Sequence, residues 1–377
     1  MKDESSIKRQ LQRERNLIPP YCPRESCKYH HGSGQRFWRY NGRKTLKRFP
    51  YTSIRFRCKA CNKTFSSSFF SLNYRQKIWG LNKKIYLFHC MGVSKREIAR
   101  QVKHDEGMVR GRLIRIARSG LLIHASAVDK IKISEALVYD GLENFSFSQY
   151  DPNNINHAVG KESLFTYDFN YCPLNRKGMM SDRQKRKKQF LENEFGAYPR
   201  DAIRSSTKRV FSRLLEKTPV LTIYSDRHFQ YRRVVEIDLA DKKIEHIRVC
   251  SKIARNFKNH LFAVNNIDMQ ARHNLAAFKR ETIAFAKNSV AMLENFVLYM
   301  LYRNYMRPKF WGTHRSDPES SKKSPAMELK LRDKIQSFDE FFSKRILPSH
   351  VTLNDDWKAL YCRLDPLSRR PIRPILN

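Results

Sequence analysis

The sequence is poor in acidic residues and lacks long apolar runs, and each absence excludes a class of protein. Only 36 Asp and Glu accompany 74 Lys and Arg among the 377 residues, which leaves a formal net charge of +38. No segment is apolar and long enough to span or anchor in a bilayer, so we expect no membrane partner. Because so positive a charge attracts phosphate, nucleic acid is the expected partner.

The N-terminus lacks the apolar stretch of a secretory signal, and the chain has no internal repeat. Residues 1–15 are charged throughout, so we expect a reducing compartment. The 41% hydrophobic content is enough for a sizeable core in at least one of two or three domains. Residues 315–325 have the composition of a linker, which predicts a domain boundary near residue 313.

Two close cysteine pairs lie about thirty residues apart in the N-terminal part of the chain. Cys22 and Cys27 form the first pair, and Cys58 and Cys61 form the second. Thiolates at this spacing suit one tetrahedral Zn²⁺, which can order a segment too small to fold around an apolar core. The alternative is four unrelated reduced thiols. The pattern favours a structural zinc site in a DNA-binding segment.

A basic helical stretch follows the second pair. Residues 77–90 have apolar positions at helical spacing, Gly92 marks a turn, and Ser94 can cap the next short helix. A third helix is predicted over residues 106–118, with Val109, Leu113 and Ile116 facing inward. The predicted outward and DNA-binding residues are Arg110, Arg112, Arg115 and Arg118. This is a helix-turn-helix pattern, in which arginines reach bases and phosphates in the major groove, although any basic amphipathic helix has similar spacing.

Two apolar runs further along the chain each contain an aspartate. The first run holds Asp140 and the second holds Asp226, and both are predicted to be buried strands with the carboxylate at one end. A single Asp after a strand is more often a turn former or a helix cap. A helix-like stretch over 262–287 supplies Asp268. Three converging carboxylates can hold two Mg²⁺ (or Mn²⁺) ions for phosphodiester chemistry.

The region between Asp140 and Asp226 predicts further strands and helices. Residues 157–171 indicate two further strands around a Gly-containing turn, with Asp168 structural or facing solvent. Basic helix-like stretches follow at 180–195 and 201–217. Near the C-terminus, residues 330–347 have the pattern of an amphipathic helix.

Together these features resemble bacterial insertion-sequence transposases of the DDE, RNase H-like superfamily with an N-terminal zinc ribbon and helix-turn-helix. The resemblance covers about residues 20–306. It rests on the cysteine pairs and on VSKREIARQV, VYDGLENF, IYSDRHFQY, VNNIDMQARHNLAAFKRETIAFAK and YRNYM. In that family the first acid ends the first strand, the second follows the fourth strand, and the third lies on a helix. The resemblance therefore implies that Asp140, Asp226 and Asp268 are catalytic and bind Mg²⁺ or Mn²⁺.

The third acid departs from the family pattern, because most relatives have Glu and this chain has Asp268. Glu281 is the alternative. At about 100° per residue the two positions fall on nearly opposite faces of a continuous helix, so they cannot share the role. Asp268 is favoured because the Arg272 and His273 that follow it match the family's third-acid segment.

The resemblance implies a multidomain α/β protein in four parts. These are a zinc ribbon with a basic arm (1–73), a helix-turn-helix domain (74–130), an RNase H-like catalytic domain (131–312), and a linker with a helical or flexible tail (313–377). It also implies a nucleoid-associated, cytoplasmic bacterial homo-oligomer that binds the terminal repeats of its element and target DNA, cleaves strands and transfers them. The alternatives are a non-catalytic zinc-dependent DNA-binding regulator derived from a transposase, and a resolvase or repair nuclease on the same fold.

Overall fold

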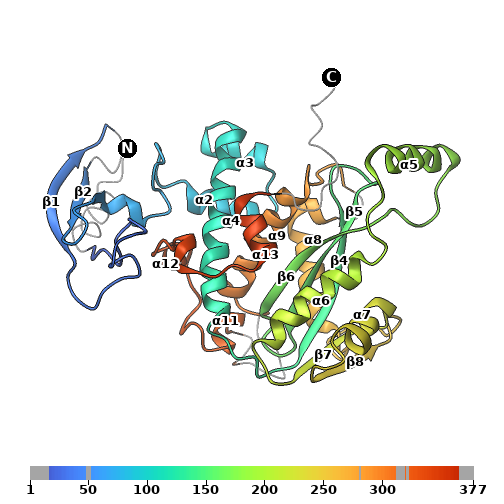
Figure 1. Cartoon of the computed structure of the whole chain (residues 1–377). Helices are drawn as coiled ribbons and strands as arrows, with labels where there is room; N and C mark the ends of the chain where they lie inside the picture. Colours follow the sequence, from blue (N-terminus) through green and yellow to red (C-terminus); the bar gives the residue numbers. More distant parts are fainter. Residues whose placement is uncertain (1–16, 48–51, 280–281, 311–318, 320–321, 365–377) are drawn as a thin grey trace. The chain divides into compact units, whose positions relative to one another are not determined.

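Two β-sheets and the helices around them make the protein mixed α/β (Figure 1). The computed structural model describes residues 17–47, 52–279, 282–310, 319 and 322–364. The chain divides into two units. The first comprises Met1–Phe88, Ser94–Ala125 and Ser337–Thr352, and the second comprises His89–Val93, Ser126–Gln336 and Leu353–Asn377. The C-terminal segment thus contributes residues to both units.

The first unit contains a three-stranded antiparallel sheet. Its order is β1-β2-β3, with β1 at Trp38–Thr45, β2 at Thr52–Cys58 and β3 at Thr64–Ser66, and the 3-10 helix η1 (Ser67–Phe70) follows. Ile54, Phe56 and Cys58 are buried, whereas Arg55 is exposed between them. This period of two places one face of β2 against the core.

Three helices follow the small sheet. They are α2 (Asn82–Cys90), α3 (Lys95–Val102) and α4 (Glu106–Val128). The turn before α3 contains Gly92 with φ at +87°, and the Ser94 hydroxyl accepts a hydrogen bond from the Glu97 N–H, so both predicted signals are confirmed. Helix α4 continues ten residues beyond the predicted end at 118, through an apolar stretch.

The second unit is built on a five-stranded sheet of order β6-β5-β4-β7-β8. The strands are β4 (Leu137–Phe145), β5 (Pro152–Gly160), β6 (Thr166–Pro173), β7 (Leu221–Asp226) and β8 (Ile244–Val249). Strand β5 runs antiparallel to β4 and β6, whereas β4, β7 and β8 are parallel. The two strands predicted within 157–171 are therefore confirmed as β5 and β6.

Helices cover both faces of this sheet (Figure 1). On one face lies α6 (Ala202–Leu215), where the Tyr139 hydroxyl donates to Thr207 Oγ1 at 3.0 Å. The other face is covered by α8 (Phe262–Asn274) and α9 (Ser289–Tyr305). The remaining helices are α5 (Asp182–Phe195), α7 (Phe229–Arg233), the π-helix η2 (Val234–Asp238), η3 (Ala276–Phe278), α11 (Pro325–Glu328), α12 (Phe338–Phe341), η4 (Pro348–His350) and α13 (Asp355–Cys362).

One prediction about a polar segment needs correction, and one about a polar residue is decided. The helix expected over 330–347 is reduced to the short α12, because Ser337 and Glu340 form a capping box that starts a new helix at Phe338. Of the two roles predicted for Asp168, the structural one is confirmed, because Asp168 is buried and its carboxylate accepts hydrogen bonds from the Arg213 guanidinium at 2.6 and 3.1 Å. The predicted linker lies largely outside the described residues.

Candidate functional site

The four cysteines of the first unit meet at one point. Their sulfur atoms all lie within 4.8 Å of one another, with Cys22 Sγ at 3.5 Å from Cys61 Sγ and Cys27 Sγ at 3.7 Å from Cys58 Sγ. Four sulfurs at about 2.3 Å from a tetrahedral Zn²⁺ are about 3.8 Å apart. These spacings therefore fit a metal ion such as zinc, as the cysteine pattern predicts.

Two tight turns present the sulfurs. In the first, the Cys22 N–H donates to the Tyr29 carbonyl at 2.8 Å, and in the second the Cys58 N–H donates to the Lys63 carbonyl at 3.0 Å. Asn62 within the second turn has φ at +58°, a left-handed conformation that Asn tolerates better than most residues. The local sequence thus bends the chain so that each cysteine pair faces inward.

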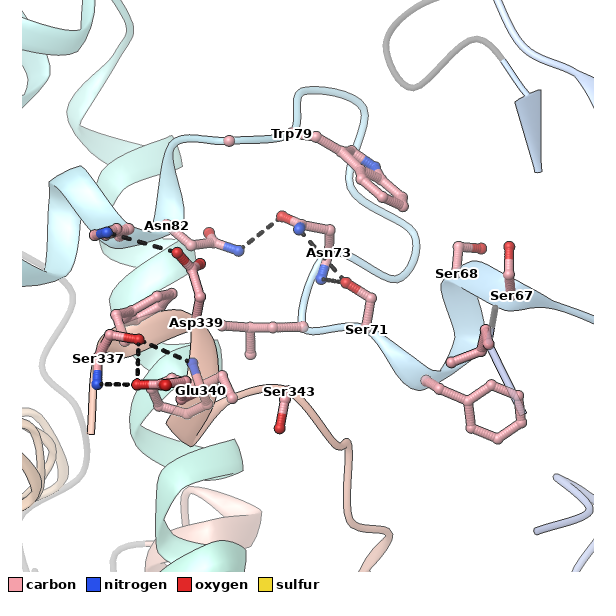
Figure 2. A pocket seen from close by; sticks show the side chains of 17 residues that line it. Ser67, Ser68, Ser71, Asn73, Trp79, Asn82, Ser337, Asp339, Glu340 and Ser343 are labelled. Atoms are coloured by element: carbon pink, nitrogen blue, oxygen red, sulfur yellow. Dashed lines mark hydrogen bonds and ion pairs between the residues drawn. The ribbon is translucent and has the colours of Figure 1, made fainter. Parts of the chain in front are cut away.

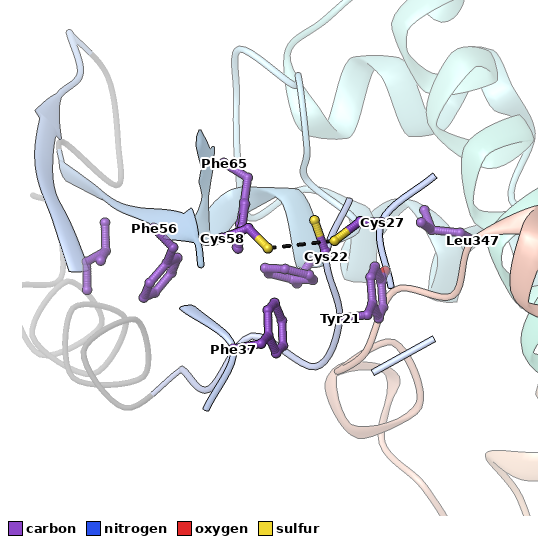
Figure 3. Close-up of a cluster of buried hydrophobic side chains, with 10 residues drawn as sticks. Tyr21, Cys22, Cys27, Phe37, Phe56, Cys58, Phe65 and Leu347 are labelled. Atoms are coloured by element: carbon purple, nitrogen blue, oxygen red, sulfur yellow. Dashed lines mark hydrogen bonds between the residues drawn. The ribbon is translucent and has the colours of Figure 1, made fainter. Parts of the chain in front are cut away.

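The cluster is embedded in an aromatic core. Phe37, Phe56 and Phe65 are buried around it (Figure 3). Burial raises the pKa of Cys22. Burial also acts to raise the pKa of Cys61, but a backbone N–H and the other three thiols outweigh it and lower that pKa to about 7. The site therefore stabilises a thiolate, which is the form of cysteine that binds metal.

Arg112 is predicted to face outward, but its side chain points inward. Its side chain is only 5% exposed, and one guanidinium nitrogen donates to Gln76 Oε1 and Asn82 Oδ1, both at 2.8 Å. A second nitrogen donates to the Ile78 carbonyl. Because these acceptors hold the guanidinium inside the first unit, Arg112 supports the fold and does not reach DNA.

The other three predicted arginines differ among themselves. Arg110 is exposed, whereas Arg115 and Arg118 are half-buried. Arg115 donates to the Tyr74 carbonyl at 2.8 Å. Among the four, Arg110 therefore has the side chain most accessible to an external phosphate.

Three polar residues form a row across the larger sheet. Asp140 on β4 is the register partner of His157 on β5. On the other side of Asp140, the paired residues Tyr139 and Ser225 directly precede Asp140 and Asp226 on the parallel strands β4 and β7. Equivalent positions on neighbouring strands project to the same face. Asp226 ends its strand as predicted, but β4 continues five residues past Asp140, so the first acid lies inside its strand.

Asp268 reaches this face from helix α8. Its Oδ1 lies 3.2 Å from Nε2 of His157, and its side chain is 16% exposed. His157 is fully buried, and its Nδ1 lies 3.1 Å from the Ile155 carbonyl oxygen. The structure therefore brings Asp268 to the row that contains Asp140. Glu281, the alternative third acid, lies outside the described residues.

The three carboxylates influence one another electrostatically. Burial, together with the charges of Asp268 and Asp226, raises the pKa of Asp140 from 3.8 to about 7. Among the described residues, only the cysteines form a group of three or more ligand atoms all within 4.8 Å of one another. Asp268 and Asp226 thus lie near enough to raise the pKa of Asp140, although the three acids do not form such a group.

His157 is the site residue that the sequence did not single out. Burial acts to lower the pKa of His157, but the Asp268 carboxylate outweighs it and raises that pKa above its ordinary value. A signal existed, because His157 interrupts a strand whose neighbouring positions are otherwise apolar or amide side chains. A charged or ionisable residue inside a fully buried strand needs a partner.

A separate cavity of about 590 Å³ lies in the first unit (Figure 2). Lys83 Nζ is 3.5 Å from Asp339 Oδ2, so these two charges are paired, and the neutral Asn82 donates to Asn73 Oδ1 at 2.9 Å. None of the predicted acids or cysteines lines it. Its walls are mainly serine, asparagine and aromatic side chains, including Ser67, Ser68, Ser71 and Trp79.

Comparison with known proteins leaves the family open. No model of a known protein family matches the chain, and no curated protein matches it. Within the described residues, no helix is long and apolar enough to cross a membrane.

Proposed function

We propose that the chain is a DNA transposase of the DDE, RNase H-like superfamily, which binds the terminal repeats of its element and cleaves and joins DNA strands with a divalent metal. The observation that carries the proposal is the approach of Asp140, Asp226 and Asp268 from three elements, close enough that the last two raise the pKa of the first. Separately placed acids that repel one another in the folded chain are typical of a functional site.

The sheet supports the RNase H-like assignment. In the resembling family, the first acid belongs to the first strand, the second follows the fourth strand, and the third lies on a helix. Counting within the five-stranded sheet, Asp140 lies on the first strand β4, Asp226 ends the fourth strand β7, and Asp268 lies on α8 after the fifth strand. This order of elements supports the proposal, although Asp140 lies before the end of its strand.

The acids are held in place by the chain itself. Asp226 Oδ1 accepts a hydrogen bond from the His228 N–H at 2.9 Å, and Asp140 Oδ1 accepts one from the Gly141 N–H at 2.7 Å. Such contacts fix carboxylates before substrate arrives. Bound Mg²⁺ or Mn²⁺ would activate water or a 3′-hydroxyl and stabilise the leaving oxygen of the phosphodiester.

DNA binding is supported by charge and by the cysteine cluster. The net charge of +38 favours phosphate contacts. Arg110 on α4 and the exposed Lys185, Arg186 and Lys187 on α5 offer unburied cations for that purpose. A zinc ion held by the four cysteines would fix the small sheet that precedes the helix-turn-helix. Holding two element ends at once calls for a homo-oligomer.

The test is strand cleavage and transfer with purified protein on duplexes that carry the flanking sequences of its gene. Wild type is expected to nick these ends and join them to target DNA when Mg²⁺ or Mn²⁺ is added, whereas Asp226→Asn is expected to bind the ends without cutting. Glu143→Gln is the matched control, because Glu143 is an exposed acid on the strand that carries Asp140.

Two outcomes would point to other functions. Specific end binding without cleavage by wild type, in either metal, would indicate a non-catalytic DNA-binding regulator. Metal-dependent cleavage of branched or damaged DNA, without any requirement for the end sequence, would indicate a resolvase or repair nuclease. Either result would overturn the proposal.

A further inference from the structure

The acid site contains an imidazole with an unusual environment. His157 is fully buried on β5, beside Asp140 and against the Phe296 ring of α9. Its Nδ1 lies 3.1 Å from the Ile155 carbonyl oxygen. Because a carbonyl can only accept, Nδ1 carries the hydrogen and donates it. This hydrogen bond fixes the ring so that Nε2 points to Asp268.

In the part of the chain that the structure describes, the two atoms that face each other have only one another as partners. Nε2 of His157 and Oδ1 of Asp268 form an ion pair at 3.2 Å, but neither atom makes a hydrogen bond of acceptable geometry within the described residues. Buried polar atoms in proteins nearly always have a hydrogen-bond partner or bind a metal. A shared metal ion would satisfy both atoms.

The spacing suits two ligands of one metal ion. Neighbouring ligands at about 2.1–2.2 Å from an octahedral ion are about 3.0 Å apart, near the 3.2 Å between these atoms. Histidines that bind metals usually donate their other ring N–H to a carbonyl or carboxylate, as His157 does to Ile155. Asp140, the register partner of His157, lies beside them on the neighbouring strand.

We propose that His157 is a metal ligand of the acid site, which binds one ion together with Asp268 beside Asp140. The inference rests on the proposed function, because it concerns the same metal-binding acids. A mixed imidazole and carboxylate set favours a transition metal such as Mn²⁺ over Mg²⁺, which prefers oxygen ligands alone.

The experiment is pulsed electron paramagnetic resonance of Mn²⁺ bound to the full, zinc-loaded protein without DNA. Wild type is expected to show the ¹⁴N modulation of a coordinated imidazole, and His157→Gln is expected to lose it and to bind Mn²⁺ at least about tenfold more weakly. His228→Gln is the matched control, because His228 lies two residues after Asp226 in sequence, and it is expected to keep the signal.

Three results would overturn the inference. The first is bound Mn²⁺ in wild type without ¹⁴N modulation, which would leave His157 as an ion-pair partner that only positions Asp268. The second is a signal that persists in His157→Gln, and the third is one that disappears in His228→Gln instead. The wild-type spectrum is informative even if His157→Gln fails to fold.

The inference and the proposed function fail separately. If the wild-type ¹⁴N signal depends on His157 but the protein cuts no DNA, His157 is a metal ligand and the proposed transposase function is wrong. If the protein cleaves and joins DNA but shows no such signal, the proposed transposase function stands and His157 is not a metal ligand.

Discussion

Replacing Asp140 by Asn is expected to stabilise the second unit at pH 8 in buffer without Mg²⁺ or Mn²⁺. Burial, Asp268 and Asp226 raise the pKa of Asp140 from its ordinary 3.8 to about 7, so ionising it in the folded protein is costly. One pKa unit corresponds to about 1.4 kcal/mol, which gives about 4 kcal/mol in all. Because the side chain is partly exposed, water reduces this cost, and we expect about 2–4 kcal/mol.

The sign of this effect depends on pH. Between pH 3.8 and about 7, the folded protein keeps a proton on Asp140 that the unfolded chain has released. The stability of the wild type therefore falls as the pH rises through this window and is lowest above it. Asn at position 140 does not titrate, so its advantage should be small near pH 4 and complete by pH 8.

Amide hydrogen exchange of peptides from β4 and β5 measures the effect within the second unit. At pH 8 the Asp140→Asn variant is expected to exchange roughly 30-fold or more slowly than wild type, since each tenfold change corresponds to about 1.4 kcal/mol. The control Glu143→Gln should match wild type. Equal exchange in Asp140→Asn and wild type at pH 8, or a gain as large at pH 4 as at pH 8, would refute the reasoning.

Three further predictions concern the rest of the chain. Cys58→Ser and Cys61→Ser are expected to lose zinc and specific end binding while β4–β8 keep their amide protection, and zinc near one per chain in both variants would contradict this. Arg112→Met is expected to destabilise the first unit by about 2–4 kcal/mol, because it leaves the buried acceptors of Arg112 without a hydrogen-bond donor. Arg110→Ala should instead weaken DNA binding with little change in stability. Melting curves and DNA titrations measure both effects, and the reverse pattern would contradict the prediction. Arg213→Met leaves the Asp168 carboxylate buried without its guanidinium and should cost about 3–5 kcal/mol in urea unfolding, compared with less than about 0.5 kcal/mol for the exposed Arg100→Met.

Local features were predictable from the sequence. The cap at Ser94 and the strand that ends at Asp226 each depend on residues within a few positions of one another, and within each cysteine pair the spacing is equally short. The inward position of Arg112 could also have been predicted from the sequence. It lies three residues after Val109 and four before Ile116, so it shares their helical face. Its charge, and not its spacing, made it look like a surface residue.

The remaining features depend on contacts between distant parts of the chain. The residues next to His157 in the sequence do not predict its contacts. The sheet register places it beside Asp140, and the packing of α8 brings Asp268 to it. For the same reason the sequence left open whether Asp168 is structural or faces solvent, since its partner Arg213 is 45 residues away. A single sequence carries little information about such pairings.

The central claim is tested most directly by movement of a marker gene placed between the gene's own flanking ends in cells. The protein would be supplied as wild type, Asp226→Ala, Asp268→Ala or Glu281→Ala. Movement is expected with wild type and Glu281→Ala, and none with Asp226→Ala or Asp268→Ala. Movement that survives Asp268→Ala and stops with Glu281→Ala would contradict the assignment of the third acid, and no movement with wild type despite intact end binding would contradict the transposase itself.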